Sequence, residues 1–190
     1  MRHRTTARSR SRRSALLIID MINRFDFPGG RALSRRAQAI GANVLRLREA
    51  HARKGWPVVY CNDNFGRWRS DFRTVVEACA RTGEGAEVVD LLRPGADDYF
   101  ILKPKHSAFY STALDLLLRS LRVRRVVLCG IAGDSCVQAT AIDAHVRDYE
   151  VEIASDATAS ITPVRNRRAL ATLAAADVAR VAATATLVRR

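Results

Sequence analysis

Short apolar runs alternate with longer amphipathic stretches along most of the chain. The run at residues 15–19 is continuously apolar and stops abruptly at the charge of Asp20. Continuous apolar runs of this length are typical of strands that are buried on both faces. We predict six strands of this kind, at residues 15–19, 57–61, 98–102, 125–131, 151–154 and 178–181.

The stretches between these runs have apolar residues at helical spacing. In residues 33–54, for example, Ile40, Val44 and Leu47 fall on one helical face, and Gly55 follows as a stop signal. Further helices are expected at residues 71–81, from 112 onward, 135–147 and 164–175. Strands separated by helices predict a parallel sheet that helices cover on each side.

Composition indicates one ordinary globular domain without a membrane partner. The chain has 190 residues, of which 48% are hydrophobic and 27% charged, and no apolar run approaches the roughly 20 residues of a membrane span. Its four cysteines, at positions 61, 79, 129 and 136, include no C-x-x-C pair. We therefore expect reduced thiols and a cytoplasmic protein.

Positive charge is concentrated at the start of the chain. Six arginines within residues 1–13 contribute to a net charge of +13. Arg12 and Arg13 could pass for a twin-arginine signal, but only five apolar residues follow before Asp20, without a cleavage site. We expect residues 1–13 to be a disordered tail and residues 14–190 to form the domain.

Three predicted strand ends carry residues that make chemical sense together. Asp20 ends the first strand, Lys103 ends the third, and Cys136 follows the fourth at the start of a helix. Reactive groups of parallel α/β folds gather beyond the carboxyl ends of the strands. A helix N-terminus and a nearby ammonium should lower the pKa of the Cys136 thiol, whereas apolar settings should raise those of Cys79 and Cys129.

These residues suggest a nucleophilic site, although each one also has an ordinary structural explanation. Asp20 would accept the thiol proton, Lys103 would hold the negative charge, and the N–H groups around Ala132 and Cys136 would cradle an oxyanion. Alternatively, Asp20 is a helix cap, Lys103 a solvated charge and the cysteine a core residue. Spacing alone leaves these interpretations balanced.

Three motifs favour the nucleophilic site, because they resemble the motifs of a known enzyme family. The segment Gly130-Ile-Ala-Gly-Asp-Ser-Cys-Val137 resembles the G-[VI]-x-x-[DN]-x-C-V signature of the isochorismatase-like cysteine hydrolases. Asp20-Met-Ile-Asn-Arg-Phe25 resembles their D-M-Q-N-x-F motif, and Lys103-Pro-Lys-His-Ser-Ala-Phe109 resembles their K-x-x-x-S-A-F motif. The motifs occur in the family's order, and the resemblance covers about residues 14–181.

The resemblance implies both a fold and an activity. The fold would be a Rossmann-like three-layer sandwich with a six-stranded parallel sheet, and Asp20, Lys103 and Cys136 would form a catalytic triad. A cis peptide between Ile131 and Ala132 and an oxyanion hole at Ala132 and Cys136 are also implied. Such enzymes hydrolyse small amides, ureides or carbamoyl compounds through an acyl-enzyme without a cofactor, and they are commonly dimers or tetramers.

The chain departs from the family pattern in two places. Ile22 stands where the family usually has Gln, so a polar contact near Asp20 is absent or comes from elsewhere. Nicotinamidases have metal-binding histidines after the second strand, whereas residues 62–66 contain none. Nicotinamidase activity and any metal are therefore disfavoured. Hydrolysis of a vinyl ether, as in true isochorismatases, remains an alternative, but those enzymes lack the nucleophilic cysteine.

Residues on loops beyond the strand ends are candidates for binding a small-molecule substrate. We predict this role for Phe25, Asn62, Asn64, Trp68 and Phe109. Trp68 and Phe109 could equally be ordinary core or interface aromatics.

A non-catalytic role in binding nucleic acid is the remaining alternative. The sequence pI near 10.9 favours it, but the basic residues do not alternate with aromatic ones as in stacking surfaces. We therefore expect no specific nucleic-acid partner.

Deleting residues 1–13 should leave folding and turnover intact, because the tail lacks apolar residues with which to join the core. Thermal unfolding of the full-length and truncated chains checks this. A fall in melting temperature of several degrees, corresponding to about 1 kcal/mol, would show that the tail packs on the domain.

Overall fold

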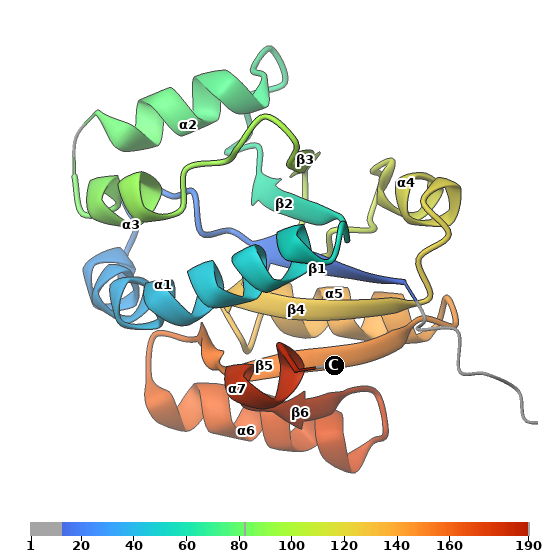
Figure 1. The fold of residues 1–190 in the computed structure, drawn as a ribbon. Helices are drawn as coiled ribbons and strands as arrows, with labels where there is room; N and C mark the ends of the chain where they lie inside the picture. The colour runs from blue at the N-terminus through green and yellow to red at the C-terminus, as the bar shows by residue number, and fades with distance from the viewer. Residues whose placement is uncertain (1–12, 82, 190) are drawn as a thin grey trace, which may run out of the picture.

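The computed structural model describes residues 13–81 and 83–189, and within them six strands form one parallel sheet (Figure 1). The strand order is β3-β2-β1-β4-β5-β6. The strands are β1 (Ser14–Ile19), β2 (Val58–Asp63), β3 (Tyr99–Lys103), β4 (Arg125–Ile131), β5 (Glu150–Ala159) and β6 (Arg180–Ala182). The predicted tail, apart from Arg13, lies outside the described residues.

Helices cover both faces of this sheet. One face packs against α1 (Gly30–Arg53), α2 (Phe72–Ala80), α3 (Ala86–Leu91) and α7 (Thr184–Leu187). The other packs against α4 (Leu114–Ser120), α5 (Cys136–His145) and α6 (Pro163–Ala175). The predicted Rossmann-like three-layer sandwich is therefore confirmed. Within the described residues, no helix is long and apolar enough to cross a membrane.

The apolar runs of the sequence correspond to strands that are buried on both faces. In β1, Leu16 and Ile18 belong to the core beneath α1, whereas Leu17 and Ile19 belong to the core beneath α5. Successive side chains of a strand point to opposite faces, so a central strand needs apolar residues at every position.

Several boundaries differ from the predictions. The helices α3 and α7 were not predicted, because six and four residues are too few to show a helical period. Strand β5 extends to Ala159, well beyond the predicted end at Ala154. Ser155 and Asp156 interrupt the apolar pattern there, and Asp156 accepts hydrogen bonds from the backbone and hydroxyl of Thr184 at 2.7 Å.

The carboxyl ends of β1 and β4 approach each other closely. Gly130 has a φ of 109°, and a Cβ atom at this position would lie 2.2 Å from the carbonyl oxygen of Ile19. Only glycine fits there. From β1 the sheet grows to one side with β2 and β3 and to the other side with β4, β5 and β6. The contact between β1 and β4 is therefore the topological switch point, where α/β folds bind ligands.

Histidine 51 makes the stability of the fold depend on pH. It is buried on α1, where burial lowers its pKa to about 4 from an ordinary value near 6.5. The unfolded chain therefore binds more protons between these values, and stability should fall by about 2 kcal/mol from pH 7.5 to pH 5. His51→Leu should remove this part of the slope in denaturant titrations at both pH values.

The exposed His145 on α5 provides the matched control. His145→Leu should keep the slope of the unmodified chain. An unchanged slope in His51→Leu would contradict the assignment.

Candidate active site

The three predicted catalytic residues converge at the carboxyl edge of the sheet. Asp20 directly follows β1, Lys103 is the last residue of β3, and Cys136 is the first residue of α5. The Nζ atom of Lys103 lies 2.8 Å from Oδ2 of Asp20 and 3.5 Å from Sγ of Cys136. One ammonium thus contacts both the carboxylate and the thiol.

Lys103 reaches this position by extending across the neighbouring strand. In the sheet register it pairs with Asp63 of β2, whose carboxylate lies 3.8 Å from the ammonium. Nζ also donates to the carbonyl oxygen of Lys105 at 3.3 Å. Burial alone would lower the pKa of Lys103, but the carboxylates of Asp20 and Asp63 raise it, so the ammonium stays charged.

Asp20 is held rigidly between the first two strands. Its backbone has a φ of 51°, and its N–H donates to the carbonyl oxygen of Cys61 at 3.0 Å. Its Oδ1 accepts the backbone N–H of Asp63 at 2.8 Å. Burial raises the pKa of Asp20, against the opposing effects of Lys103 and Cys136, so the carboxylate is a stronger base than an exposed aspartate.

The prediction of a lowered pKa for the Cys136 thiol is wrong. Burial and the nearby charge of Asp20 raise this pKa to about 12, although Lys103 lowers it. The thiol of Cys136 therefore keeps its proton at neutral pH. The predictions for the other cysteines are confirmed, since burial raises the pKa of Cys79 to about 11 and also raises that of Cys129.

The turn between β4 and α5 presents two free amides beside the thiol. The peptide between Ile131 and Ala132 is cis, as the resemblance implies. Among the described residues, the N–H groups of Ala132 and Cys136 donate to no backbone acceptor, whereas the neighbouring N–H of Gly133 donates to Ala159 at 2.9 Å. These two amides have the free donor capacity that an oxyanion hole requires.

A hollow of about 430 Å³ opens above the thiol. Its polar lining includes the two carboxylates next to Lys103, the imidazole of His106 and an ion pair between Asp134 and Arg165 at the mouth. The full lining is Asp20, Asn23, Phe27, Leu33, Asp63, Phe65, His106, Ile131, Ala132, Asp134, Ser135, Cys136, Ile161 and Arg165.

The five residues predicted to bind substrate lie outside this lining. Phe25 and Phe109 are buried in the two cores, and Trp68 is 79% exposed. Asn64 accepts the N–H of Gly66 within its own turn. Asn62 is fully buried, and its amide is used to hold a neighbouring loop.

The loop that Asn62 holds is the one after β1. The side-chain amide of Asn62 accepts the backbone N–H of Ile22 at 3.2 Å and donates to the carbonyl oxygen of Ile22 at 2.6 Å. The Ile22 side chain itself packs in the core beneath α1. The position that usually carries Gln in the family therefore makes no polar side-chain contact here.

Sequence reasoning missed three groups at the site. Asp63 ends β2, between the strands of Asp20 and Lys103, so its position at a strand end was a usable signal. His106 belongs to a motif that was recognised, but only its contact at 3.7 Å with Sγ of Cys136 shows its relevance. Arg165 comes from α6, the helix that follows β5, and no local pattern marks it.

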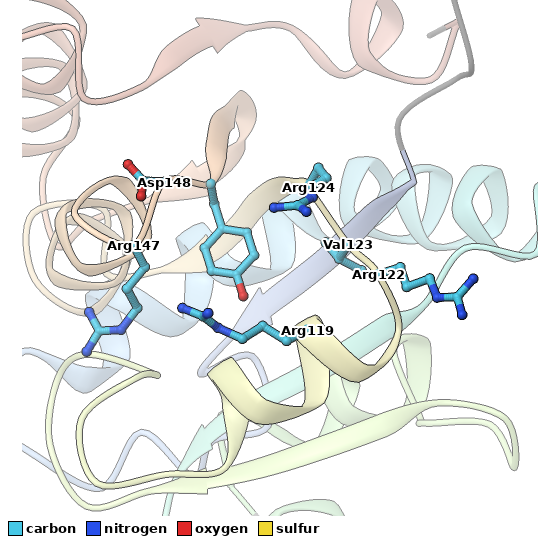
Figure 2. Close-up of a pocket in the computed structure, with 7 residues that line it drawn as sticks. Arg119, Arg122, Val123, Arg124, Arg147 and Asp148 are labelled. Atoms are coloured by element: carbon cyan, nitrogen blue, oxygen red, sulfur yellow. The ribbon is translucent and has the colours of Figure 1, made fainter.

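A hollow of about 460 Å³ also exists at the opposite edge of the sheet, and Figure 2 shows its lining. Two of its arginines pair with carboxylates four residues earlier in the chain, Arg119 with Asp115 at 2.8 Å and Arg147 with Asp143 at 3.2 Å. In Figure 2, Arg122 points away from the other labelled side chains. The site near Cys136, not this hollow, combines nucleophile, base and cation. The lining is Arg119, Arg122, Val123, Arg124, Arg147, Asp148 and Tyr149.

No group of three or more metal-ligating side chains comes together in the part of the chain that the structure describes. The loop after β2 contributes Asp63, and this carboxylate faces the Lys103 ammonium.

Comparison with known proteins shows to which family the chain belongs. The family model of the isochorismatase domain matches residues 14–186. The chain belongs to the isochorismatase family. This isochorismatase-family chain is 43% identical to an uncharacterized isochorismatase family protein, YaaI, of Bacillus subtilis (strain 168), over 82% of its own length and 86% of the relative.

Two named enzymes are also similar to this family member. The solved structure of N-carbamoylsarcosine amidase from Thermoplasma acidophilum has a TM-score of 0.69 at 31% identity, covering 90% of this chain and 96% of that one. Ureidoacrylate amidohydrolase RutB of Acinetobacter baylyi is 38% identical over a shorter stretch, which is 47% of this chain and 37% of the relative. The relatives therefore include amidohydrolases.

Limiting iodoacetamide should label Cys136 first. The other three thiols are at most 1% exposed, and only Cys136 combines partial exposure with a nearby carboxylate, that of Asp20. Peptide mass spectrometry of the folded chain checks the order of labelling. In denaturant all four cysteines should react alike, which controls for intrinsic reactivity. Preferential labelling of Cys61 would overturn the assignment.

Proposed function

We propose that this isochorismatase-family chain is a cysteine hydrolase that cleaves the C–N bond of a small amide, ureide or carbamoyl compound. The supporting observation is the contact of Lys103 with both Cys136 and Asp20, at 3.5 and 2.8 Å. The names of the relatives N-carbamoylsarcosine amidase and ureidoacrylate amidohydrolase support the same bond type.

Formation of the acyl-enzyme starts from the neutral thiol. Sγ of Cys136 attacks the carbonyl carbon while its proton passes to the carboxylate of Asp20. The N–H groups of Ala132 and Cys136 donate to the oxyanion of the tetrahedral intermediate. The intermediate collapses when the leaving amine takes the proton from Asp20, which leaves a thioester on Cys136 and a carboxylate on Asp20.

Hydrolysis of the thioester repeats these steps with water. Asp20 accepts a proton as water attacks the thioester carbon, and the same two amides hold the oxyanion. The C–S bond then breaks, Sγ regains the proton from Asp20, and the acid product leaves. Lys103 stays charged throughout, and it stabilises whichever partner, carboxylate or thiolate, carries the negative charge.

A screen for ammonia release across carboxamides, ureides and carbamoyl compounds should find a substrate. With that substrate, Cys136→Ala should abolish turnover, and Asp20→Asn and Lys103→Ala should each reduce kcat/KM by about a hundredfold or more, because a nucleophile and its activating groups act as a unit. The acid limb of the kcat/KM profile should lie above the ordinary aspartate pKa near 4, since Asp20 acts as a base and its pKa is raised.

Matched variants outside the site are available for each substitution. Cys79→Ala, Asp26→Asn and Lys54→Ala change a buried thiol, an exposed carboxylate and an exposed ammonium, and they should keep normal turnover. Near-normal activity of Cys136→Ala would disprove the proposal. Release of pyruvate from isochorismate without ammonia release from any amide would assign the vinyl ether reaction instead.

A further inference from the structure

The thiol of Cys136 has a neighbour that the proposed mechanism does not use. The Nδ1 atom of His106 lies 3.7 Å from Sγ, within hydrogen-bond reach for sulfur. His106 is exposed and lines the hollow, whereas Asp20 and Lys103 contact the same sulfur from the buried side. The sulfur therefore lies between the buried carboxylate of Asp20 and the solvent-exposed imidazole of His106.

Hydrogen bonds hold the backbone on either side of His106. The carbonyl oxygen of Lys105 accepts the Lys103 ammonium at 3.3 Å. On the other side, the N–H of Ala108 donates to the hydroxyl of Thr140 at 3.1 Å, and Thr140 lies on α5, the helix that begins with Cys136. The segment with His106 is thus tied both to the cation and to the helix of the nucleophile.

The chemistry of the contact fits a proton acceptor. With its proton on Nε2, an imidazole presents the lone pair of Nδ1 to a thiol. The remaining polar groups near Sγ are the Lys103 ammonium, which is a donor, and the Ser135 hydroxyl at 4.0 Å. Among the described side chains that contact the sulfur, only Asp20 and His106 are therefore bases.

We propose that His106 is a second proton acceptor for the Cys136 thiol, on the open side of the sulfur. This inference rests on the proposed role of Cys136 as nucleophile. The S–H bond breaks, its proton moves to Nδ1, and the products are a thiolate and an imidazolium, so no further reactant is needed. The thiolate then lies between two cations, Lys103 and His106, while Asp20 keeps its negative charge.

Both transfers leave the same total charge on the cluster of Asp20, Lys103, Cys136 and His106. Transfer to Asp20 neutralises the carboxylate, whereas transfer to His106 replaces a neutral imidazole by a cation and a thiol by an anion. The cluster therefore has two proton arrangements of equal net charge, and loss of one acceptor leaves the other in place.

Alkylation kinetics test this without a substrate. Rate constants for the neutral reagent iodoacetamide at Cys136 would be measured by peptide mass spectrometry in the unmodified chain, Asp20→Asn, His106→Gln and the double variant. Glutamine keeps a polar side chain but does not take up a proton. We expect Asp20→Asn to retain measurable reactivity, and the double variant to react about tenfold more slowly than Asp20→Asn.

The controls separate this proposal from its alternatives. His145→Gln removes an exposed histidine at the far end of α5 and should not change the rate in either background. Equal rates for Asp20→Asn and the double variant would overturn the role of His106. Failure of the proposed hydrolase function would appear separately, as ammonia release that persists in Cys136→Ala, and would leave the alkylation result unaffected.

Discussion

The site is organised around a lysine ammonium that has no access to solvent. Lys103 is fully buried, and a buried charge is strongly unfavourable unless an opposite charge and hydrogen bonds compensate it. Asp20 supplies the charge at 2.8 Å, and the Lys105 carbonyl supplies a further acceptor. Asp20 follows β1 and Lys103 ends β3, so the parallel sheet, with β2 between these two strands, brings the carboxylate and the ammonium together. Because the Lys103 ammonium also contacts Sγ of Cys136, this ion pair keeps the Asp20 carboxylate close to the thiol.

This arrangement explains why the thiol keeps its proton. The ammonium and the helix N-terminus favour the thiolate, but burial and the Asp20 carboxylate oppose it more strongly. A lysine ammonium next to a cysteine, without a carboxylate nearby, would lower the pKa of the thiol and favour the thiolate in the resting state. In the mechanism proposed above, the Asp20 carboxylate holds the negative charge until a substrate binds, and the thiolate forms only as Sγ attacks.

The apolar pattern of the sequence predicted the layers of the fold. The three residues at the centre of the site followed from the resemblance of their motifs to a known family, because their positions at strand ends alone left the assignment balanced. Continuous apolar runs identify the strands, and the residue after each run lies at the reactive edge. The lining of the hollow depends instead on side-chain direction and on distant segments. Asn62 follows the pattern as well as Asp63 does, yet its amide binds the backbone of Ile22. The sign of the thiol pKa shift was unpredictable for the same reason, since it depends on burial and on the distance to Asp20.

The raised pKa of Cys136 also bears on how the protein withstands peroxide. Peroxides oxidise thiolates far faster than thiols, and the first product, a sulfenic acid, leads on to irreversible forms. A thiolate that reacts fast with substrate is, for the same reason, also oxidised fast. In the proposed mechanism Cys136 keeps its proton until a carbonyl is in position, so it should react with peroxide more slowly than a resting thiolate would, although it is the most accessible of the four thiols.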